Sequence, residues 1–272
     1  MKFAFLAATL AATLAGCGTT YQISEIDPGT ASTAARMFAE ASSDARRAPA
    51  GPAEALARFE RVVARVRPVA ERLCADELGR GVAACGARIG IDTAMPVPNA
   101  YFTYADEAKR EPRIMVTVPM LRDVANDDEL AFVVAHEYGH LIGQHIQKAE
   151  QQALAGALLL GVIAAAATHD MPHTPYRQDL IEDSMSLGGA VGSKAFSQTY
   201  ELESDTLGTA IARMAGFDPV AGARYFARPA PERAADGGLS FWGTHPPDET
   251  RMATVIATNR QIDEHGGLVR KR

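Results

Sequence analysis

The chain has 272 residues, of which 47% are hydrophobic and 22% charged, and its formal net charge is −6. This length and composition fit a chain with one sizeable globular domain. The negative balance argues against nucleic acid as a partner, because nucleic-acid binding needs a basic surface.

The N-terminus has the pattern of an export signal. Lys2 precedes an apolar stretch that runs to Leu14, too short to anchor stably across a bilayer. The stretch ends in Leu-Ala-Gly-Cys at Cys17, which resembles the bacterial lipobox. We expect a lipoprotein signal peptide over residues 1–16 and acylation of Cys17, for example with palmitate; the alternative is an ordinary signal peptide with an incidental cysteine. Gly18 resembles the signal for the Gram-negative outer membrane, so we expect the mature chain on its inner leaflet, facing the periplasm.

Two further cysteines, Cys74 and Cys85, form an even pair. In an oxidising compartment such a pair favours a disulfide, and Gly79 and Gly81 between them allow a turn. The alternative is two reduced cysteines. Neither has a Cys-x-x-Cys neighbour, which argues against a cysteine zinc site.

The first half of the chain predicts helices followed by a small sheet. A polar tether is expected from residue 18 to about residue 30. Two helices are expected over residues 31–47 and 53–77, with a potential kink at Pro68. Short strands rich in Ile, Val and Tyr follow, at residues 88–92, 100–104 and 114–118.

The sequence His136-Glu137-Tyr138-Gly139-His140 lies in a segment that predicts a helix from about residue 127 to 150. Asn126 or Asp127 can cap that helix. His136 and His140 are four residues apart, so both imidazoles lie on one helix face and can bind one metal ion. Glu137 lies about 100° around the helix, within reach of a water molecule beside that ion. The pattern indicates a zinc metallopeptidase; the alternative is a pair of ordinary core or surface histidines.

Other histidines near the motif carry no such signal. His145 follows His140 by five residues, about 140° around the helix, and is not expected to bind the same ion. His169, His173 and His265 have no ligand spacing and are predicted to be surface residues.

Residues 153–167 are uninterrupted apolar and small residues, fewer than the roughly 20 needed to cross a bilayer. We expect a buried or interfacial helix rather than a transmembrane span, or a segment that covers the cleft. Residues 168–192 contain two prolines and a Gly-Gly pair and predict a mobile loop that acts as a lid.

A third metal ligand is expected in a helix that contains Glu201 and Asp205 and ends near Gly216. These two carboxylates share a helix face, whereas Glu203 points elsewhere. One of the two would bind zinc while the other orients a ligand histidine. The alternative is a solvated acidic face. A further helix is predicted to start at Asp218.

His245 precedes two prolines, so it is expected in an extended or turn segment. It would stabilise the tetrahedral intermediate or occupy the fourth position on zinc in a resting state. The alternative is a loop histidine that hydrogen-bonds locally.

Four segments together resemble the zinc metallopeptidases related to the CAAX prenyl protease and to the bacterial proteins HtpX, BepA and LoiP, in a lipoprotein branch. The segments are Pro-Asn-Ala-Tyr at 98–101, residues 129–140, residues 201–205 and Thr-His-Pro-Pro at 244–247. The resemblance covers roughly residues 60 to 255. It implies that Glu201 is the third zinc ligand and that Asp205 is the carboxylate beside it. One departure is Ser204, where this family usually has Ala.

We therefore expect an α+β, mostly helical, zincin-like peptidase domain over residues 51–260, with a small sheet beside the helix of the motif. Residues 17–50 would hold the acylated cysteine, the tether and an N-terminal helix, and residues 261–272 a C-terminal tail. One Zn²⁺ per chain is expected, with Glu137 as the general base. The strand that includes Asn99, Ala100 and Tyr101 is expected to pair with an extended substrate.

The resemblance implies quality control of the envelope, with unfolded, misfolded or misassembled envelope proteins as the substrates. Two other functions stay open: a chaperone or assembly factor for outer-membrane proteins with latent protease activity, and a purely structural zinc lipoprotein with a closed coordination sphere. The oligomeric state cannot be predicted from the sequence.

Overall fold

The computed structural model describes residues 19–43, 48–79, 81, 85–194, 197–228 and 240–271. The predicted signal peptide and Cys17 lie outside these residues. The chain forms two compact units. We call Tyr21–Gly143 with Glu201–Arg272 the α+β unit, and Gln144–Tyr200 with Thr19 and Thr20 the hairpin unit.

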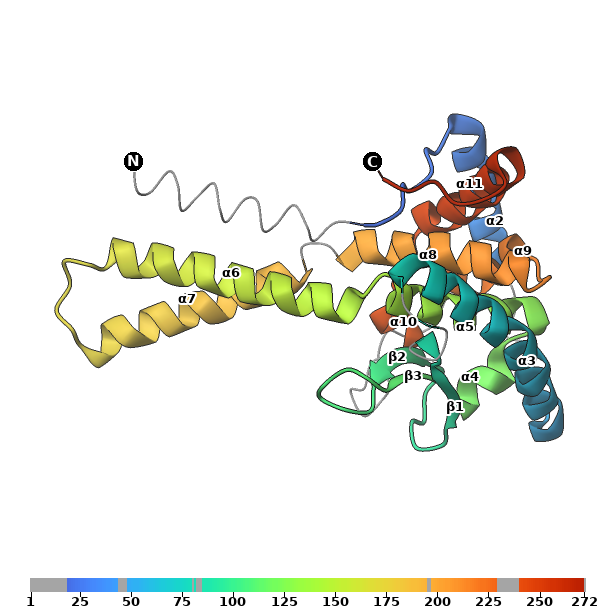
Figure 1. The fold of residues 1–272 in the computed structure, drawn as a ribbon, viewed down its shortest axis with the longest axis horizontal. Helices are drawn as coiled ribbons and strands as arrows, with labels where there is room; N and C mark the ends of the chain where they lie inside the picture. The colour runs from blue at the N-terminus through green and yellow to red at the C-terminus, as the bar shows by residue number, and fades with distance from the viewer. Residues whose placement is uncertain are drawn as a thin grey trace. The chain divides into compact units, whose positions relative to one another are not determined.

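The α+β unit is mostly helical (Figure 1). Its helices are α2 (Pro28–Ser43), α3 (Pro52–Leu78), α4 (Val118–Asp123), α5 (Asp127–Ile142), α9 (Pro219–Ala223), the 3-10 helix η3 (Arg224–Ala227), α10 (Phe241–Thr244) and α11 (Glu249–His265). Helix α8 (Ser197–Met214) belongs to this unit from Glu201 onward. Together with a three-stranded sheet, these helices confirm the predicted fold class.

The longest helix of this unit, α3, agrees with its predicted range. It starts with Pro52 in its first turn and ends at Gly79, whose φ of 59° lies in the left-handed region that glycine adopts without strain. Pro68 lies inside it. The buried side chains recur every three or four residues, as an amphipathic helix requires. They include Phe59, Val62, Val63, Val66, Val69 and Ala70.

The sheet has the strand order β1-β3-β2, with β1 (Arg88–Asp92) parallel and β2 (Ala100–Tyr104) antiparallel to β3 (Pro112–Thr117). The third strand therefore begins two residues earlier than predicted. Alternate residues are buried, including the cross-strand partners Phe102 and Ile114. Strands β2 and β3 lie against α5, so the sheet supports the helix that carries the His-Glu motif.

Helix α5 runs through the core, since nearly all of its residues are buried. The Asn126 side chain accepts a hydrogen bond from the Glu129 backbone N–H and caps the helix, as predicted. The predicted continuous helix to residue 150 is wrong. Helix α5 ends at Ile142, and Gln144 has a φ of 54°, so the chain turns before the next helix begins.

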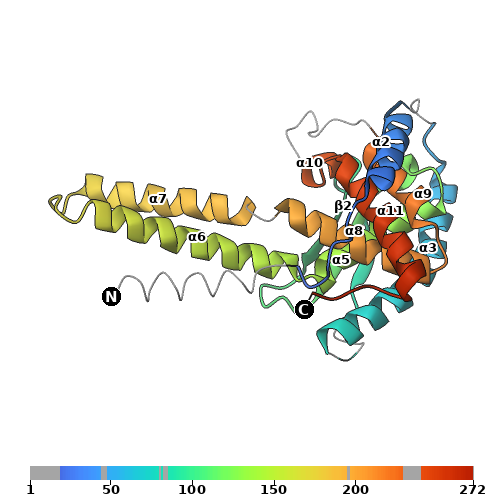
Figure 2. The same ribbon diagram turned by 90° about the horizontal axis from the view of Figure 1, so that it is seen from above.

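The hairpin unit consists of α6 (His145–Ala167) and α7 (Pro175–Lys194), which run side by side in opposite directions (Figures 1 and 2). The prediction of a lid loop over residues 168–192 is wrong, because most of that stretch is α7. Its glycines pack against α6: a Cβ on Gly188 would lie 2.2 Å from the Gly156 carbonyl oxygen. These glycines thus allow close packing of the two helices. They do not interrupt the helix, contrary to the prediction of a loop.

The N-terminal segment packs against the α+β unit from Tyr21 onward, within the range predicted as a tether. Tyr21 is buried, pairs with Arg270 in an isolated β-bridge and donates its backbone N–H to the Glu203 carboxylate at 3.1 Å. Helix α2 starts at Pro28, three residues before the predicted position. Residues 21–30, which were predicted as part of the tether, therefore belong to the α+β unit.

Candidate metal centre

Helix α5 brings its two motif histidines together, as the four-residue spacing requires. The Nε2 atoms of His136 and His140 lie 3.1 Å apart. His136 is fully buried, and Glu137 on the next position is also buried. The Glu137 Oε1 atom makes no hydrogen bond to any described residue, and its ion-pair partner is His245 Nε2, 3.3 Å away.

Helix α8 crosses α5 closely enough to add a carboxylate. A Cβ on Gly139 would lie 2.7 Å from the Ser204 Cα, and one on Gly208 would lie 3.1 Å from the His136 backbone nitrogen. Gly139 therefore has no room for a Cβ atom, and a Cβ atom at Gly208 would make a tight contact. Ser204, the departure from the family pattern, lies at this crossing and is fully buried.

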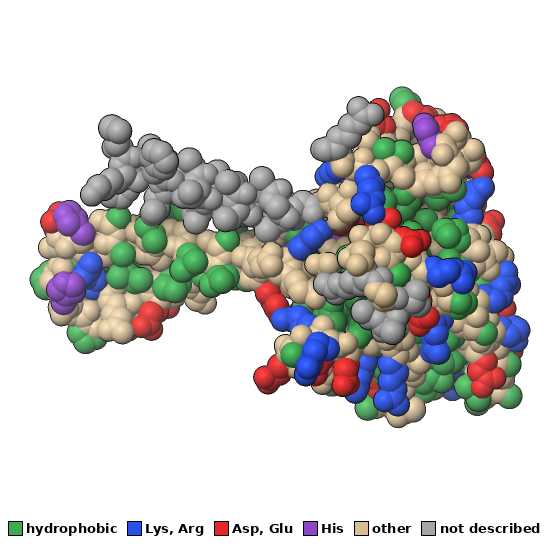
Figure 3. Space-filling model, in the orientation of Figure 1, with side chains coloured by type: hydrophobic (Ala, Val, Ile, Leu, Met, Phe, Trp, Pro, Cys, Tyr) green, Lys and Arg blue, Asp and Glu red, His purple; other side chains and the backbone are tan. Residues whose placement is uncertain are grey.

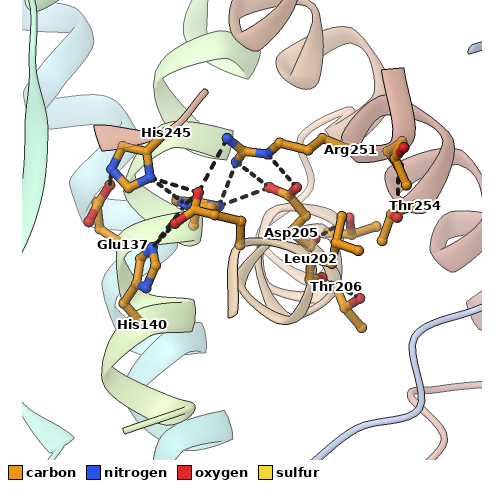
Figure 4. Close-up of polar contacts among 12 residues, drawn as sticks. Glu137, His140, Leu202, Asp205, Thr206, His245, Arg251 and Thr254 are labelled. Atoms are coloured by element: carbon orange, nitrogen blue, oxygen red, sulfur yellow. Dashed lines mark hydrogen bonds and ion pairs between the residues drawn. The ribbon is translucent and has the colours of Figure 1, made fainter. Parts of the chain in front are cut away.

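The close crossing places both predicted carboxylates at the histidines. Glu201 lies 3.4 Å from His136 Nε2 through Oε2 and 3.4 Å from His140 Nε2 through Oε1. Asp205 instead lies 2.9 Å from Nδ1 of His136, on the far side of that ring. Glu203 points elsewhere, as predicted, toward Tyr21. Figure 4 shows Asp205, His140 and Glu137 around the cluster.

His245 completes the cluster from the α10 segment. It follows the last residue of that short helix with φ −129° and is buried. Its Nδ1 atom lies 2.8 Å from Glu201 Oε2 and 3.3 Å from His136 Nε2. Its Nε2 atom lies 3.3 Å from Glu137 Oε1. His245 is thus not a loop residue that bonds only to its own neighbours.

Arg251 on α11 was not predicted from the sequence. Its guanidinium donates to Asp205 through Nε and Nη2, each at 2.8 Å, and its Nη1 lies 3.2 Å from Glu201 Oε2 (Figure 4). The side chain is buried over the Phe226 ring, 4.3 Å from its centroid. A single arginine six residues after His245 gives no periodic signal in a sequence.

The four ligand atoms are close enough to hold one metal ion. Those of His136, His140, Glu201 and His245 all lie within 4.8 Å of one another. In a tetrahedral zinc site with bonds of about 2.0–2.2 Å, ligand atoms are about 3.3–3.6 Å apart. The separations of 3.1 and 3.4 Å among the two motif histidines and Glu201 agree with such a site. Imidazole nitrogen with carboxylate oxygen is also a donor set that suits zinc.

Burial and neighbouring charges shift the pKa values of the cluster in different directions. Burial opposes ionisation of Glu201, yet His245 and Arg251 hold the pKa of its carboxyl well below the usual value. Burial lowers the pKa of His140 and keeps its imidazole neutral, the form that binds metal. Burial also lowers the pKa of His136, but hydrogen bonds to Asp205 and Glu201 outweigh it and raise that pKa to about 9.

The predicted substrate strand lies at one edge of the sheet. Asn99 precedes β2, and its backbone exchanges hydrogen bonds with Thr117, so its main chain is already paired. Ala100 is buried, and the Tyr101 hydroxyl donates to Asp92 at 2.9 Å. No strand among the described residues pairs with the other edge of β2. The Phe241 N–H donates to the Pro98 carbonyl at 2.9 Å, which ties the His245 segment to the start of this strand.

The remaining predicted residues lie apart from the cluster. Cys74 and Cys85 are joined by a disulfide with a Cα–Cα distance of 5.8 Å. Within the hairpin unit, His145 stacks on Tyr200 with ring centroids 4.5 Å apart. His169, His173 and His265 are exposed, as predicted.

Comparisons with known proteins agree with this cluster. Residues 62–259 match the model of peptidase family M48. The chain is 29% identical over 150 residues to the beta-barrel assembly-enhancing protease of Yersinia pestis, which covers 54% of this chain and 30% of the relative. It is 30% identical over 148 residues to a putative beta-barrel assembly-enhancing protease of Vibrio cholerae serotype O1, covering 50% and 28% respectively.

The match to these relatives spans less than a third of their length. The family model, in contrast, covers most of this chain, including the motif helix, Glu201, His245 and Arg251. The chain belongs to peptidase family M48, a family of metallopeptidases.

Proposed function

We propose that this protein is a zinc endopeptidase of the bacterial envelope. The observation that carries the proposal is the convergence of His136, His140 and Glu201 beside the buried Glu137 carboxylate. These three residues would hold the metal ion, and Asp205 would fix the His136 ring through Nδ1. Three protein ligands with a remaining exchangeable position are typical of catalytic zinc sites.

The chain's own residues supply the proton transfers. Zinc, when bound, supplies a Lewis acid that activates water and polarises the scissile carbonyl. Glu137 would accept the proton from the attacking water through Oε1, which makes no hydrogen bond among the described residues, and would donate it to the leaving amine. The edge of β2 that pairs with no other described strand would hold the substrate backbone in an extended form.

His245 would occupy the exchangeable position in a resting state. Its Nδ1 atom lies 3.3 Å from His136 Nε2 and 2.8 Å from Glu201 Oε2, close enough for all three atoms to bind one metal ion, which supports this role. A substrate would then have to displace it. If so, His245→Ala should raise the rate of peptide hydrolysis, whereas a residue that stabilises the tetrahedral intermediate would lower the rate when removed.

A purely structural zinc site is the second reading of the same four ligands. A closed site needs no acid beside it, and burying a carboxylate oxygen that lacks a hydrogen bond is costly. The buried Glu137 carboxylate has such an oxygen, Oε1, which makes no hydrogen bond among the described residues and lies 3.3 Å from His245 Nε2. This favours the catalytic reading, with His245 as a displaceable ligand.

Location and substrates extend the proposal. The lipobox at Cys17 supports acylation and an anchor in the outer membrane, facing the periplasm. Two relatives carry names that refer to beta-barrel assembly, and by analogy the substrates would be unfolded or misassembled envelope proteins. The alternative is an assembly factor whose proteolysis stays latent, and it predicts binding of such proteins without cleavage.

Metal analysis tests the ligand assignment. The purified protein should bind one zinc per chain, and His140→Ala should abolish this binding. His145→Ala is the matched control and should keep the metal, because its ring stacks on Tyr200 within the hairpin unit. Equal zinc loss in both variants would contradict the assignment.

A further inference from the structure

Helix α6 exposes an apolar surface that has no partner within its own unit. Leu154, Leu158, Leu159, Val162 and Ile163 are 62%, 48%, 41%, 51% and 53% exposed. We call these five residues the apolar back of α6. Hydrophobic side chains are visible along the hairpin in Figure 3, with histidine and charged side chains at its tip. From Ala153 to Ala167 the helix has no polar side chain.

Helix α7 covers the opposite side of α6, so it leaves the apolar back uncovered. A Cβ on Gly192 would lie 3.3 Å from Ala153 Cα, which places Ala153 at the contact between the helices. Val162 follows Ala153 by nine residues, which is two and a half helical turns. Its side chain therefore points away from α7, in line with its exposure.

The first half of α7 is acidic on the side that faces away from α6. Asp179 precedes Gly188 by nine residues, and Asp183 precedes Gly192 by nine, so both point away from the contact with α6. Both are exposed, as is Glu182 between them. Further along α7, Leu187 and Val191 are exposed as well, so the acidic side is confined to the first half of that helix. The two-helix layer thus has an apolar side formed by α6, and its acidic residues lie on the first half of α7.

We propose that this hairpin lies in the surface of a lipid bilayer, with the apolar back among the acyl chains and the acidic side of α7 toward water. A helix with one apolar and one charged side takes this position at an interface. The proposal rests on the envelope location given above and adds a second membrane contact to the predicted anchor at Cys17.

A lipid surface fits the apolar back better than a protein partner does. Protein interfaces are enriched in aromatic residues and Arg and carry about one hydrogen bond per 100–200 Å². The apolar back consists only of Leu, Val and Ile, and its neighbours along the helix are Ala, Gly and Leu160. It offers neither the anchors nor the polar groups that fix the orientation of a protein partner.

The hairpin is not expected to cross the bilayer. Helix α6 is long and apolar enough to do so by length and composition, and among the described residues it alone passes that test. At 1.5 Å per residue its 23 residues span about 34 Å, against about 30 Å of hydrocarbon. Helix α7, however, would carry Arg177, Asp179, Glu182 and Asp183 into the hydrocarbon, which is highly unfavourable.

The N-terminus keeps the protein close to that surface. Tyr21 is already packed in the α+β unit, four residues after Cys17. Four residues span at most about 14 Å. An acylated Cys17 would therefore hold the α+β unit next to the lipid headgroups.

A fluorescent label on the apolar back tests the proposal in the full chain as isolated from membranes. Leu158→Cys introduces one thiol for labelling. Of the three natural cysteines, Cys17 would be blocked by acylation, and Cys74 and Cys85 are bonded to each other. The label is an environment-sensitive dye, and the vesicles consist of phosphatidylethanolamine and phosphatidylglycerol, with or without nitroxides on the acyl chains. Asp179→Cys carries the same label as the matched control, and Val162→Cys replaces Leu158→Cys if that variant fails to bind zinc.

With vesicles, we expect the label at residue 158 to shift to the blue, to be quenched by the acyl-chain nitroxides and to lose several-fold in quenching by aqueous iodide. The label at residue 179 should stay accessible to iodide. Equal iodide access at residue 158 with and without vesicles would overturn the proposal. A blue shift without vesicles that grows with protein concentration would assign the surface to a second copy instead, and protection of residue 179 would contradict the flat placement.

These outcomes are separate from the test of the proposed function. Zinc content and casein cleavage by the labelled protein report on the metal centre, and a hairpin that stays in water would leave both unchanged. A protein without hydrolytic activity could still show the lipid contact.

Discussion

Arg251 donates two hydrogen bonds of 2.8 Å to Asp205, and Asp205 lies 2.9 Å from Nδ1 of His136. A buried arginine on α11 thus holds the carboxylate that orients a proposed metal ligand on α5. The paired donors of a guanidinium match the two oxygens of a carboxylate, which a lysine cannot reproduce.

Removal of Arg251 should therefore weaken zinc binding. We expect Arg251→Met to lower zinc affinity by about 10–100-fold, the usual cost of losing a partner of a metal ligand. It should also lower the free energy of unfolding by about 3–5 kcal/mol, because the Asp205 carboxylate stays buried without its counter-charge. Arg251→Lys should lose less. Competition with a fluorescent chelator measures the zinc affinity. The control is Arg260→Met on the same helix: Arg260 pairs with the exposed Asp27, so its removal should leave the zinc affinity unchanged.

Glu201 and Glu203 form a matched pair on α8. Glu201→Gln should weaken zinc binding, because a neutral amide is a poorer ligand than a carboxylate. Glu203→Gln should keep the zinc, since that carboxylate accepts from the Tyr21 backbone and does not reach the histidines. Zinc content after dialysis reads out both variants. A greater loss in Glu203→Gln would mean that the third ligand has been assigned wrongly.

Gly139→Ala should impair the site without changing any ligand. The added methyl group would meet the Ser204 backbone at 2.7–2.8 Å and push α8 away from α5. The Glu201 carboxylate would then lie too far from His136 and His140 to bind the same metal ion, so zinc affinity and the thermal midpoint of unfolding should both fall. Gly189→Ala is the control, because its Cβ would meet only ordinary contacts at 3.5 Å or more. Unchanged zinc affinity in Gly139→Ala would show that the helix crossing does not set the ligand distance.

Asp27 should make the stability of the α+β unit depend on pH in the acidic range. Hydrogen bonds from Thr30 and the charge of Arg260 hold the pKa of its carboxyl well below the usual value. A lowered pKa contributes stability above the unfolded-state value of about 3.9, and this is lost as the pH falls through the folded-state pKa. The difference in free energy of unfolding between wild type and Asp27→Asn should thus be largest near neutral pH and shrink below pH about 4. Urea titrations at several pH values measure it, and a difference independent of pH would contradict the assignment.

The local patterns in the sequence predicted the centre of the fold well. Helix periodicity and the Asn126 cap located α5, and strand composition located β1 and β2 at their observed bounds. The four residues of the candidate metal cluster were named from spacing and from the family resemblance. Such features depend on residues near one another in the chain, and are therefore visible in one sequence.

Long-range packing could not be predicted in this way. Arg251 acts through contacts with α8, and Gly139 matters only because α8 crosses there. Most of the segment predicted as a lid loop forms α7. Its glycines allow close packing on α6, and this tertiary contact outweighs the low helix propensity of glycine. The turn at Gln144 likewise could not be predicted, because its positive φ occurs at a residue that is not glycine.

Hydrolysis of unfolded casein by the zinc-loaded protein, with Glu137→Gln as the comparison, tests the central claim most directly. The substitution removes the proton acceptor but no ligand, so both proteins should contain one zinc per chain. Wild type should cleave casein, and Glu137→Gln should be slower by about 10²–10⁴-fold. Cleavage by Glu137→Gln at the wild-type rate, or no cleavage by zinc-loaded wild type and His245→Ala alike, would contradict the assignment of this cluster as a peptidase site.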